Sequence, residues 1–345
     1  MIIYKLAVHS LRSHKERLIE LDPKVTVITG SNGSGKTTLL EALYISLQGS
    51  SFKGSDSEVL STGADWWRID VETEDELKRV VKFDPSRTTG RKQFVIDEKT
   101  HYRLMPKYKY PVVLFDPDDM RLLNGSPARR RQFIDRFVGQ LNPLYSATLR
   151  KYERALKQRN NLLKRAQVTS DELFAWDVAL AEYSSYIIEQ RILCVEQINA
   201  RLSDTYNDIA HSPDTVSVHY SHTLIGDGKQ KLLAELQASL VRDTVLGNTS
   251  VGPHRHDVLF TFNQLTAQST ASRGENRTIV LALKFLEVDI IEQLTGMKPL
   301  VLLDDVFSEL DEARQKALSA AVRDCQIVMT STHTLSNKGF KRIKL

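Results

Sequence analysis

Residues 30–37 read Gly30-Ser31-Asn32-Gly33-Ser34-Gly35-Lys36-Thr37, and this stretch decides the fold. Positions 24–29 before it are rich in β-branched residues, which predicts a strand, and residues 38–47 after it have helical spacing. The pattern G-x-x-x-x-G-K-[ST] between a strand and a helix is the P-loop. The sequence therefore predicts an α/β protein with a site for a nucleoside triphosphate.

The residue types of this loop have chemical reasons. Its glycines allow a tight turn that points backbone N–H groups at phosphate oxygens, and the helix N-terminus adds partial positive charge. Lys36 is expected to reach the β- and γ-phosphates of ATP, and the Thr37 hydroxyl to ligate Mg²⁺. The residues expected to contact the nucleotide here are Gly30, Ser31, Asn32, Gly33, Ser34, Gly35, Lys36, Thr37 and Thr38.

A second motif is the apolar run at 299–303, which ends in Asp304 and Asp305. A continuous apolar run is typical of a strand buried in a parallel sheet, and acids at its end lie at the ligand edge. Asp304 fits the Walker B role of holding Mg²⁺ through water. Asp305 fits the role of a base or water-positioning group for attack on the γ-phosphate. The alternative is a strand that merely ends in a polar turn.

A third motif, at 269–277, precedes a helix expected over 278–294. Ser272, Gly274 and Glu275 give it a Ser-x-Gly-polar start, which is typical of an anion-binding helix N-terminus. It resembles the signature motif of ABC-type ATPases, in which one protomer closes on the γ-phosphate held by the P-loop of another. The alternative is an ordinary N-cap and glycine turn.

Two further residues after the predicted Walker B strand stand in the order in which ABC-type ATPases carry their D-loop and switch histidine. Asp311 ends the segment 308–311, which matches the D-loop. His333 follows a strand expected at 325–330 and stands about one residue from the register of the switch histidine. The nucleotide-binding assignment therefore includes Asp311, and the catalytic assignment comprises Lys36, Asp304, Asp305, Ser272 and His333.

Composition and charge narrow the class of protein. The 345 residues are 26 % charged and 41 % hydrophobic, which is ordinary for a globular chain of about two domains. No apolar run has transmembrane length and the N-terminus lacks a signal-peptide pattern, so a cytoplasmic protein without a membrane partner is expected. The two cysteines are far apart, which disfavours a disulfide framework or a zinc site.

Positive charge is concentrated at 101–170. This segment has 15 Lys and Arg and 5 Asp and Glu, which gives a local charge of +10 within a net charge of +4. The rest of the chain, with 32 basic and 38 acidic residues, is then −6. The basic block is a candidate contact for a polyanion, the alternative being a solvated helix face.

About 235 residues separate the P-loop from the signature motif. This insertion is longer than that of a transporter ATPase and far shorter than the arms of chromosome-structural SMC proteins. Helices are expected over 129–149 and 150–166, the second with an apolar stripe that includes Ala166, and a longer helix runs to about 209. In this long helix a heptad of apolar residues predicts a hairpin packed within the chain, with a partner-helix interface as the alternative. The heptad residues are Phe174, Ala181, Ile188, Val195, Leu202 and Ile209.

Several segments together resemble the RecF family over nearly the whole length. They are the opening strand with its turn at Arg12, then 35–42, 51–53, 63–65, 115–120, 125–135, 252–257 and 304–311. Two departures are Asn276, where the signature usually has Gln, and His256, where the motif at 252–257 usually has Asp. The resemblance implies an ABC-type ATPase head formed by 1–115 and 255–345, with an α-helical DNA-facing lobe at 116–254.

The resemblance also implies a function. Arg12 would lie near the adenine, and ATP with Mg²⁺ would sit between two protomers of an ATP-dependent homodimer. Such a protein is a weak DNA-dependent ATPase that binds double-stranded DNA and single-strand/double-strand junctions, and works with RecO and RecR to deliver RecA. The alternatives are a divergent phage, mobile-element or defence ATPase of the same fold, a transport ATPase subunit, and a purely structural scaffold.

Overall fold

The computed structural model describes residues 1–74, 77–165, 169–222, 227–307, 310–332 and 340–345. Its contacts divide the chain into two compact units, Met1–Asp119 with Glu287–Leu345, and Met120–Leu286. Residues 255–286 thus belong to the second compact unit, whereas the sequence-based boundary placed them with the ATPase head; the functional division into lobes stays a prediction. Within the described ranges, no helix is both long and apolar enough to cross a membrane.

A parallel five-stranded sheet forms one layer of the first unit, in the order β14-β3-β13-β12-β8. Strands β8, β12 and β13 are buried along their whole length, which explains their continuous apolar sequence. Because all five strands run in the same direction, their carboxyl ends meet at one edge, where the P-loop begins. The strands are β3 (Val25–Thr29), β8 (Val112–Phe115), β12 (Leu300–Leu303), β13 (Ile327–Ser331) and β14 (Lys341–Lys344).

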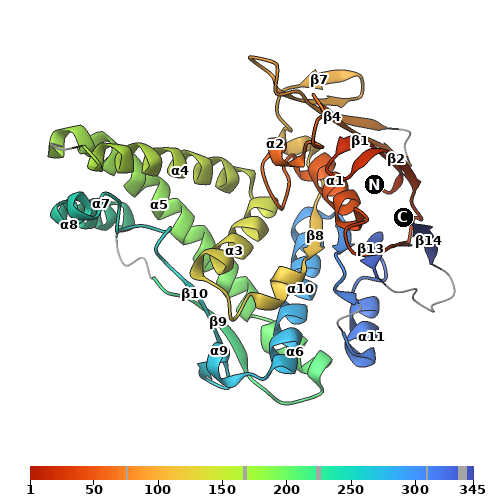
Figure 1. The fold of residues 1–345 in the computed structure, drawn as a ribbon. Helices are drawn as coiled ribbons and strands as arrows, with labels where there is room; N and C mark the ends of the chain where they lie inside the picture. The colour runs from red at the N-terminus through yellow and green to blue at the C-terminus, as the bar shows by residue number, and fades with distance from the viewer. Residues whose placement is uncertain (75–76, 166–168, 223–226, 308–309, 333–339) are drawn as a thin grey trace. The chain divides into compact units, whose positions relative to one another are not determined.

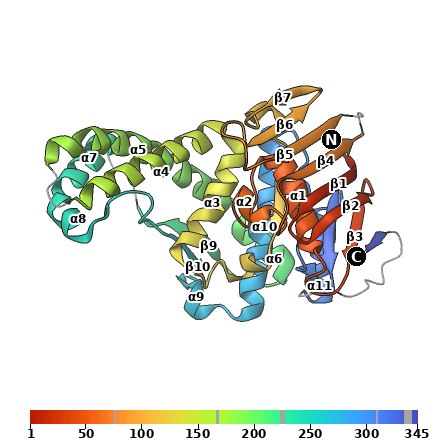
Figure 2. The ribbon, with the colours of Figure 1, turned by 45° about the horizontal axis from the view of Figure 1, so that its top comes forward.

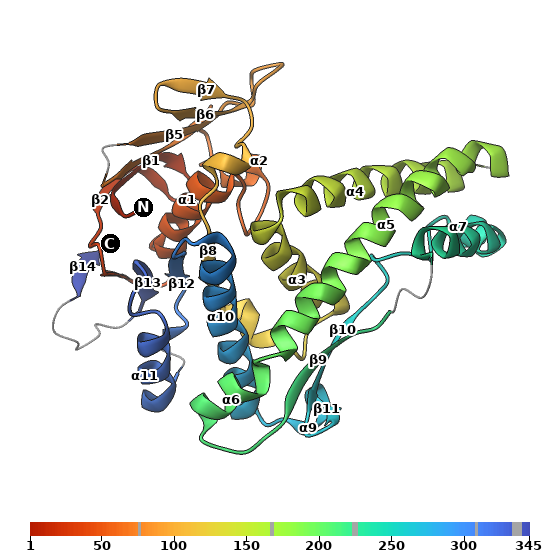
Figure 3. The same ribbon diagram turned by 180° about the vertical axis from the view of Figure 1, so that it is seen from behind.

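An antiparallel six-stranded sheet forms another layer of the first unit, in the order β2-β1-β4-β5-β6-β7. Alternate residues of β4 are buried, so one face of this sheet packs on the core and the other faces solvent. Helix α1 (Lys36–Gln48) contacts strands of both sheets and lies between them (Figures 1 and 3). The strands are β1 (Ile3–Leu11), β2 (His14–Glu20), β4 (Trp67–Thr73), β5 (Lys78–Phe83), β6 (Lys92–Ile96) and β7 (Lys99–His101).

Shorter elements complete the first unit, and α10 begins in the second unit and ends in the first. Helix α11 follows Asp311 on the chain between β12 and β13. These elements are α2 (Asp56–Val59), η1 (Pro106–Tyr108), η2 (Pro117–Arg121), α11 (Glu312–Ala321) and α10 (Arg273–Thr295).

The second unit is mainly helical. Helices α4 and α5 pack against each other and α7 packs on α5, as Figure 2 shows, while β9, β10 and β11 form a small antiparallel sheet. The elements are α3 (Pro127–Leu141), α4 (Pro143–Leu163), α5 (Ser170–Asn199), α6 (Leu202–Ala210), β9 (Val216–Tyr220), α7 (Gly228–Ala238), α8 (Leu240–Leu246), β10 (Val258–Phe262), β11 (Leu265–Thr266) and α9 (Ala267–Thr270).

Three helix predictions in this unit were wrong in their bounds. The boundary expected at 149–150 lies at Asn142, which ends α3 and whose side chain also caps α4 before Pro143. The long helix expected to about 209 ends at Asn199, and α6 starts a new helix at Leu202. The helix expected from 278 begins five residues earlier, at Arg273.

The heptad assigned to the long helix is only partly its buried face. Phe174 is 51 % exposed, because the neighbouring Leu173 takes the interior position of α5. The buried face also includes Asp177 and Arg191, polar residues that an apolar heptad cannot reveal. The prediction that the helices pack within the chain is confirmed by the contact of α4 with α5. Ala166 lies outside the described residues.

Candidate functional site

The P-loop has the strand–loop–helix geometry that the sequence predicts. Gly33 and Gly35 adopt φ values of 80° and 91°, which are left-handed conformations that favour glycine. A Cβ on Gly35 would also lie 2.4 Å from His14 Nε2 and 2.5 Å from Ser13 Oγ. The loop therefore needs glycine at this position for two independent reasons, one conformational and one steric.

The Lys36 ammonium is buried and held inside the loop. Its Nζ donates to the carbonyl oxygens of Gly30 at 3.0 Å and Ser31 at 3.1 Å, and lies 3.9 Å from Asp305 Oδ2. Only 5 % of the Lys36 side chain is exposed. The structure thus directs the cation along the inner side of the loop, where phosphate groups bind in P-loop proteins.

The Thr37 hydroxyl and Asp304 meet, although 267 positions separate them in the sequence. Thr37 Oγ1 donates to Asp304 Oδ1 at 2.6 Å, and Thr330 Oγ1 on β13 donates to the same oxygen at 3.1 Å. The ammonium of Lys53 lies 3.2 Å from the other oxygen, Oδ2. Asp304 is 2 % exposed, so these partners compensate a buried carboxylate.

Asp305 follows at the end of β12 with an unusual backbone. Its φ is 52°, a left-handed conformation that few non-glycine residues adopt, and its N–H donates to Thr330 Oγ1 at 2.8 Å. Thr330 therefore fixes both acids that follow β12, through the side chain of Asp304 and the backbone of Asp305. This arrangement turns consecutive acids in different directions at the edge of the sheet.

Arg12 is held beside the P-loop by the buried carboxylate of Glu41. Its Nη2 and Nε donate to the two oxygens of Glu41 at 2.8 Å and 2.5 Å, and Ser51 Oγ also donates to Glu41. Glu41 lies on α1 with no exposed side-chain surface. The hydrogen bond to Glu41 raises the pKa of Arg12 further above its ordinary value. The guanidinium is therefore locked as a cation at the rim of the P-loop.

A pocket of about 450 Å³ lies over the P-loop, within the range of ligand pockets, roughly 300–1,000 Å³. Ser34 Oγ is buried in this loop and has no hydrogen-bond partner among the described residues. The pocket brings together seven of the fourteen residues assigned to the nucleotide by sequence, together with Asp305 and Ser13. Its lining residues are Arg12, Ser13, Asn32, Gly33, Gly35, Lys36, Thr37, Thr38 and Asp305.

The oxygen donors of Thr37 and Asp304 suit Mg²⁺, which takes oxygen ligands and usually uses only one or two carboxylates beside phosphates and water. In the described ranges, no cluster of three or more His, Cys, Asp or Glu side chains could hold a metal by itself. The donor set therefore fits a magnesium ion that arrives with a nucleotide.

Asp116 is an acid of this edge that the sequence analysis left without a role. It follows β8, whose neighbour in the sheet is β12, and the Asp304 N–H donates to the carbonyl of Phe115 at 2.9 Å. Burial raises the pKa of Asp116, with further increases from the nearby charges of Asp119 and Asp304 and a decrease from that of Lys53. The parallel register of β8 and β12 is the physical reason that these acids share an edge.

The signature motif begins α10 with a capping box. The backbone N–H of Ser272 donates to Glu275 Oε2 at 2.6 Å, and the Glu275 N–H donates to Ser272 Oγ at 3.3 Å. Ser272 is exposed and thus accessible. The N-cap interpretation is therefore correct for Ser272, and its role at a γ-phosphate stays a prediction, as do those of Gly274 and Glu275.

Of the last two residues assigned by sequence, Asp311 lies within the described residues and His333 does not. Asp311 is the N-cap of α11, accepting from the Arg314 N–H at 2.9 Å and pairing with the Arg314 side chain. Its D-loop role stays a prediction. His333 lies outside the described residues.

The motif at 252–257 ties helices of the second unit together. Arg191 on α5 donates to the Pro253 carbonyl at 2.8 Å and pairs with Asp135 at 2.8 Å. Arg130 on α3 holds Asp257 with two hydrogen bonds of 2.8 Å and 2.7 Å. This network gives the motif a structural role that its sequence alone does not indicate.

Helix α4 and the two residues after its end carry seven of the fifteen basic residues of the block at 101–170. Arg159, near the C-terminal end of this helix, is fully buried and pairs with Asp177 and Asp243 at 2.6 Å and 2.7 Å, so it is structural. The remaining basic residues of α4 and its end recur on its exposed face, which suits contact with a polyanion. They are Arg150, Lys151, Arg154, Lys157, Lys164 and Arg165.

Comparisons with known proteins agree with this geometry. Residues 5–210 match the model of a family described as AAA domain. The DNA replication and repair protein RecF of Clostridium perfringens (strain SM101 / Type A) is 31 % identical over 338 residues, covering 96 % of this chain and 93 % of that protein.

Solved structures extend the likeness to three dimensions. A structure of the recombination mediator protein RecF with ATP, of the RecFOR pathway, has a TM-score of 0.88 at 28 % identity and covers 99 % of this chain and 95 % of that one. A Smc head bound to the C-winged helix domain of ScpA has a TM-score of 0.52 at 15 % identity, covers 96 % of this chain and 90 % of that one, and shares the fold. The predicted fold class, an ABC-type P-loop ATPase head with an inserted helical lobe, is confirmed.

Proposed function

The chain belongs to the RecF family of DNA replication and repair proteins, and on this premise we propose that it is an ATP-switched, DNA-binding clamp. In this proposal ATP closes two copies into a homodimer that binds double-stranded DNA near single-strand gaps, and slow hydrolysis releases it. The observation that carries the proposal is the Thr37–Asp304 contact beside the P-loop lysine, because it assembles the parts of an ATP site from distant segments.

The residues of the first unit divide the work at the nucleotide. Lys36 and the loop bind the phosphates, and Arg12, fixed by Glu41, borders the nucleotide pocket. Thr37 and Asp304 would hold Mg²⁺, which neutralises charge on the β- and γ-phosphates when bound. Asp305 orients the attacking water or accepts its proton.

The second unit supplies the other functions. Ser272 and Gly274 at the start of α10 would contact the γ-phosphate bound by the other protomer, so that ATP completes the dimer interface. The exposed basic residues of α4 and of the two positions after it, which exclude the buried Arg159, would contact phosphates of the duplex. Such contacts make binding sensitive to salt and nearly independent of sequence, because they read no base edges.

Partners follow from the family. The solved homologue is described as the recombination mediator of the RecFOR pathway, which supports RecO and RecR as partners. We infer that the loaded protein helps these partners deliver RecA to gapped DNA. Retention of RecR by the ATP-bound form, but not by a Lys36→Ala form, would support this step.

The experiment that tests the clamp is a fluorescence-anisotropy titration of labelled duplex DNA with ATP, a non-hydrolysable analogue, ADP or no nucleotide. Tight binding and a dimer by sedimentation are expected only with ATP or the analogue. The matched pair Arg154→Gln on α4 and Lys99→Gln on β7 removes one exposed cation each. Only the first should weaken binding. Equal binding in all nucleotide states would refute the switch.

A further inference from the structure

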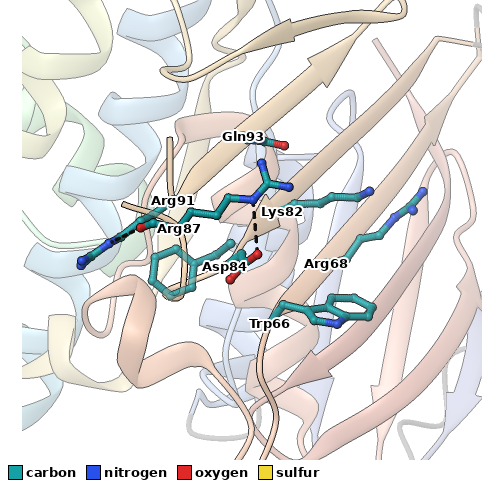
Figure 4. A pocket seen from close by; sticks show the side chains of 8 residues that line it. Trp66, Arg68, Lys82, Asp84, Arg87, Arg91 and Gln93 are labelled. Atoms are coloured by element: carbon teal, nitrogen blue, oxygen red, sulfur yellow. Dashed lines mark hydrogen bonds and ion pairs between the residues drawn. The ribbon is translucent and has the colours of Figure 1, made fainter. Parts of the chain in front are cut away.

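A second pocket of the first unit lies away from the P-loop, on the solvent-facing side of the antiparallel sheet. It has a volume of about 360 Å³, within the range of pockets that hold small ligands, roughly 300–1,000 Å³. Its lining residues, drawn in Figure 4, lie just before and at the start of β4, on β5, in the turn between β5 and β6, and on β6. Four cations and one carboxylate line it, so its ligand is expected to be an anion: Arg68, Lys82, Arg87, Arg91 and Asp84.

The register of the sheet places like charges side by side in this pocket. Arg68 on β4 lies directly opposite Lys82 on β5, and Lys82 lies opposite Gln93 on β6. Like charges in directly opposed positions destabilise a sheet unless a counter-charge is nearby. The Asp70 carboxylate neutralises part of this positive charge, because its Oδ2 accepts a hydrogen bond from Arg68 Nε at 2.7 Å. An anionic group over the row would compensate the remainder.

An aromatic ring gives the pocket a flat apolar wall. Trp66 immediately precedes β4 and lies two positions before Arg68, so the alternation of the strand places both on the outer face. Its side chain is 47 % exposed, and Figure 4 shows the indole near the side chains of Arg68 and Asp84 at one end of the pocket. A half-exposed indole beside cations is the combination that binds nucleic-acid bases together with their phosphates.

The turn that completes the pocket is formed in advance. Asp84 Oδ1 accepts from the Ser86 N–H at 3.0 Å and its Oγ at 2.6 Å, while Oδ2 pairs with Arg87 Nε at 3.3 Å. These hydrogen bonds from Ser86 lower the pKa of Asp84. The turn closes at Gly90, whose φ is +64° and against which the Tyr102 ring packs. A preformed turn lowers the ordering cost of binding.

We propose that this pocket binds one unpaired nucleotide of a single strand, with its base stacked on Trp66 and its phosphates on Arg68 and Lys82. The proposal deepens the proposed function and rests on it for its setting, because a clamp at single-strand gaps meets unpaired nucleotides beside a duplex. The indole wall favours this ligand over an acidic peptide, whose carboxylates would use the cations but not the aromatic face.

The test uses the full chain without nucleotide and a short fluorescein-labelled oligo(dT). Trp66→Ala should weaken binding about fivefold or more, since stacking on an aromatic ring contributes about that factor per base or more. Trp66→Phe keeps a ring and should restore most of the affinity. Lys82→Gln should lower the slope of log K against log salt by about 0.7, the value for one phosphate contact on a single strand.

Two controls on the same sheet match these variants. Leu18→Ala removes an exposed apolar side chain of β2, and Lys99→Gln an exposed cation of β7, and both should bind as the wild type does. Quenching of tryptophan fluorescence by the unlabelled oligonucleotide should be largely lost in Trp66→Phe. Since Trp66 and Lys82 are exposed on the surface, the variants should unfold at the wild-type temperature.

Three outcomes would overturn the proposal. They are wild-type affinity for oligo(dT) in both Trp66→Ala and Lys82→Gln, equal competition by poly-glutamate, which would assign an acidic peptide, and equal competition by free dTMP, which would assign a mononucleotide. Failure of the clamp proposal would be seen in a different experiment, the duplex titration, in which the wild type would show no ATP-dependent binding of duplex DNA.

Discussion

The Arg12–Glu41 pair permits a prediction whose size follows from its geometry. Glu41 has no exposed surface, whereas 32 % of the Arg12 side chain is exposed, and two hydrogen bonds of 2.5 Å and 2.8 Å join them. Hydrogen bonds to charged groups contribute about 1.5–3 kcal/mol each, and partial exposure of the arginine reduces this through solvent screening. We therefore expect a coupling free energy of about 2 kcal/mol between the two side chains.

A double-mutant cycle measures this coupling. Glu41→Ala, Arg12→Ala and the double variant are unfolded in urea, and the transition of the first unit is followed by the fluorescence of Trp66 and Trp67, which both lie in it. Glu41→Ala alone should cost about 3 kcal/mol, because it leaves the arginine unpaired and also removes the acceptor of Ser51 Oγ.

The control for the cycle is Glu58→Ala. Glu58 is an exposed carboxylate of α2 whose charge also acts on Arg12 but which makes no hydrogen bond to it through its side chain. Its effect on stability should be much smaller. A coupling below about 0.5 kcal/mol between Arg12 and Glu41, the usual error of additivity, would refute the interpretation that Glu41 holds the arginine at the nucleotide pocket.

Three further predictions concern charge at the site and in the helical unit. Asp305→Asn should leave ATP affinity within about threefold and slow hydrolysis about 100-fold or more, the usual contribution of a general base; unchanged turnover in a phosphate-release assay would remove this role. Asp116→Asn should raise the free energy of unfolding at neutral pH. Burial raises the pKa of Asp116. The stability that goes with its protonated form is therefore fully present below the ordinary pKa of 3.8 and is lost as the pH rises through the folded pKa. A urea midpoint of the variant equal to that of the wild type at pH 7 would contradict this. Burial lowers the pKa of His256 to about 3, so this imidazole by itself should make the helical unit about 3 kcal/mol less stable at pH 4 than at pH 7, in addition to a loss from His254, whose pKa burial lowers to about 4; His256→Asn should reduce the slope of the urea-midpoint profile without abolishing it, and an unchanged profile would argue against the buried neutral imidazole.

Local patterns were enough to locate the main parts of the nucleotide site. The P-loop, the strand before Asp304 and the strand before His333 each depend on a contiguous stretch, and the structure forms all three elements as expected. Contiguous patterns also carry the family resemblance, and the comparisons confirm it. Each of these features is specified by neighbours in sequence, which is why reading the sequence recovers them.

The partners of these motifs were not predictable, because they lie far away in the sequence. Glu41 is 29 positions from Arg12, and Lys53 is 251 positions from Asp304. The sequence of helix α1 does not indicate which of its faces contacts which sheet, because nearly all of its side chains are buried between the two sheets and it has no polar face. Most of the antiparallel sheet was missed for a related reason, because its pairing joins segments that carry no motif.

The hydrogen bonds of the free protein constrain how the proposed switch works. The Lys36 ammonium donates to two loop carbonyls, and the Ser272 hydroxyl accepts from the Glu275 N–H. An ammonium has three N–H donors, and a hydroxyl that accepts a hydrogen bond can still donate its own proton, so both groups can contact a phosphate oxygen without giving up these bonds. Closure would depend on the γ-phosphate that Lys36 of one protomer and Ser272 of the other share, so loss of that phosphate on hydrolysis would reopen the clamp.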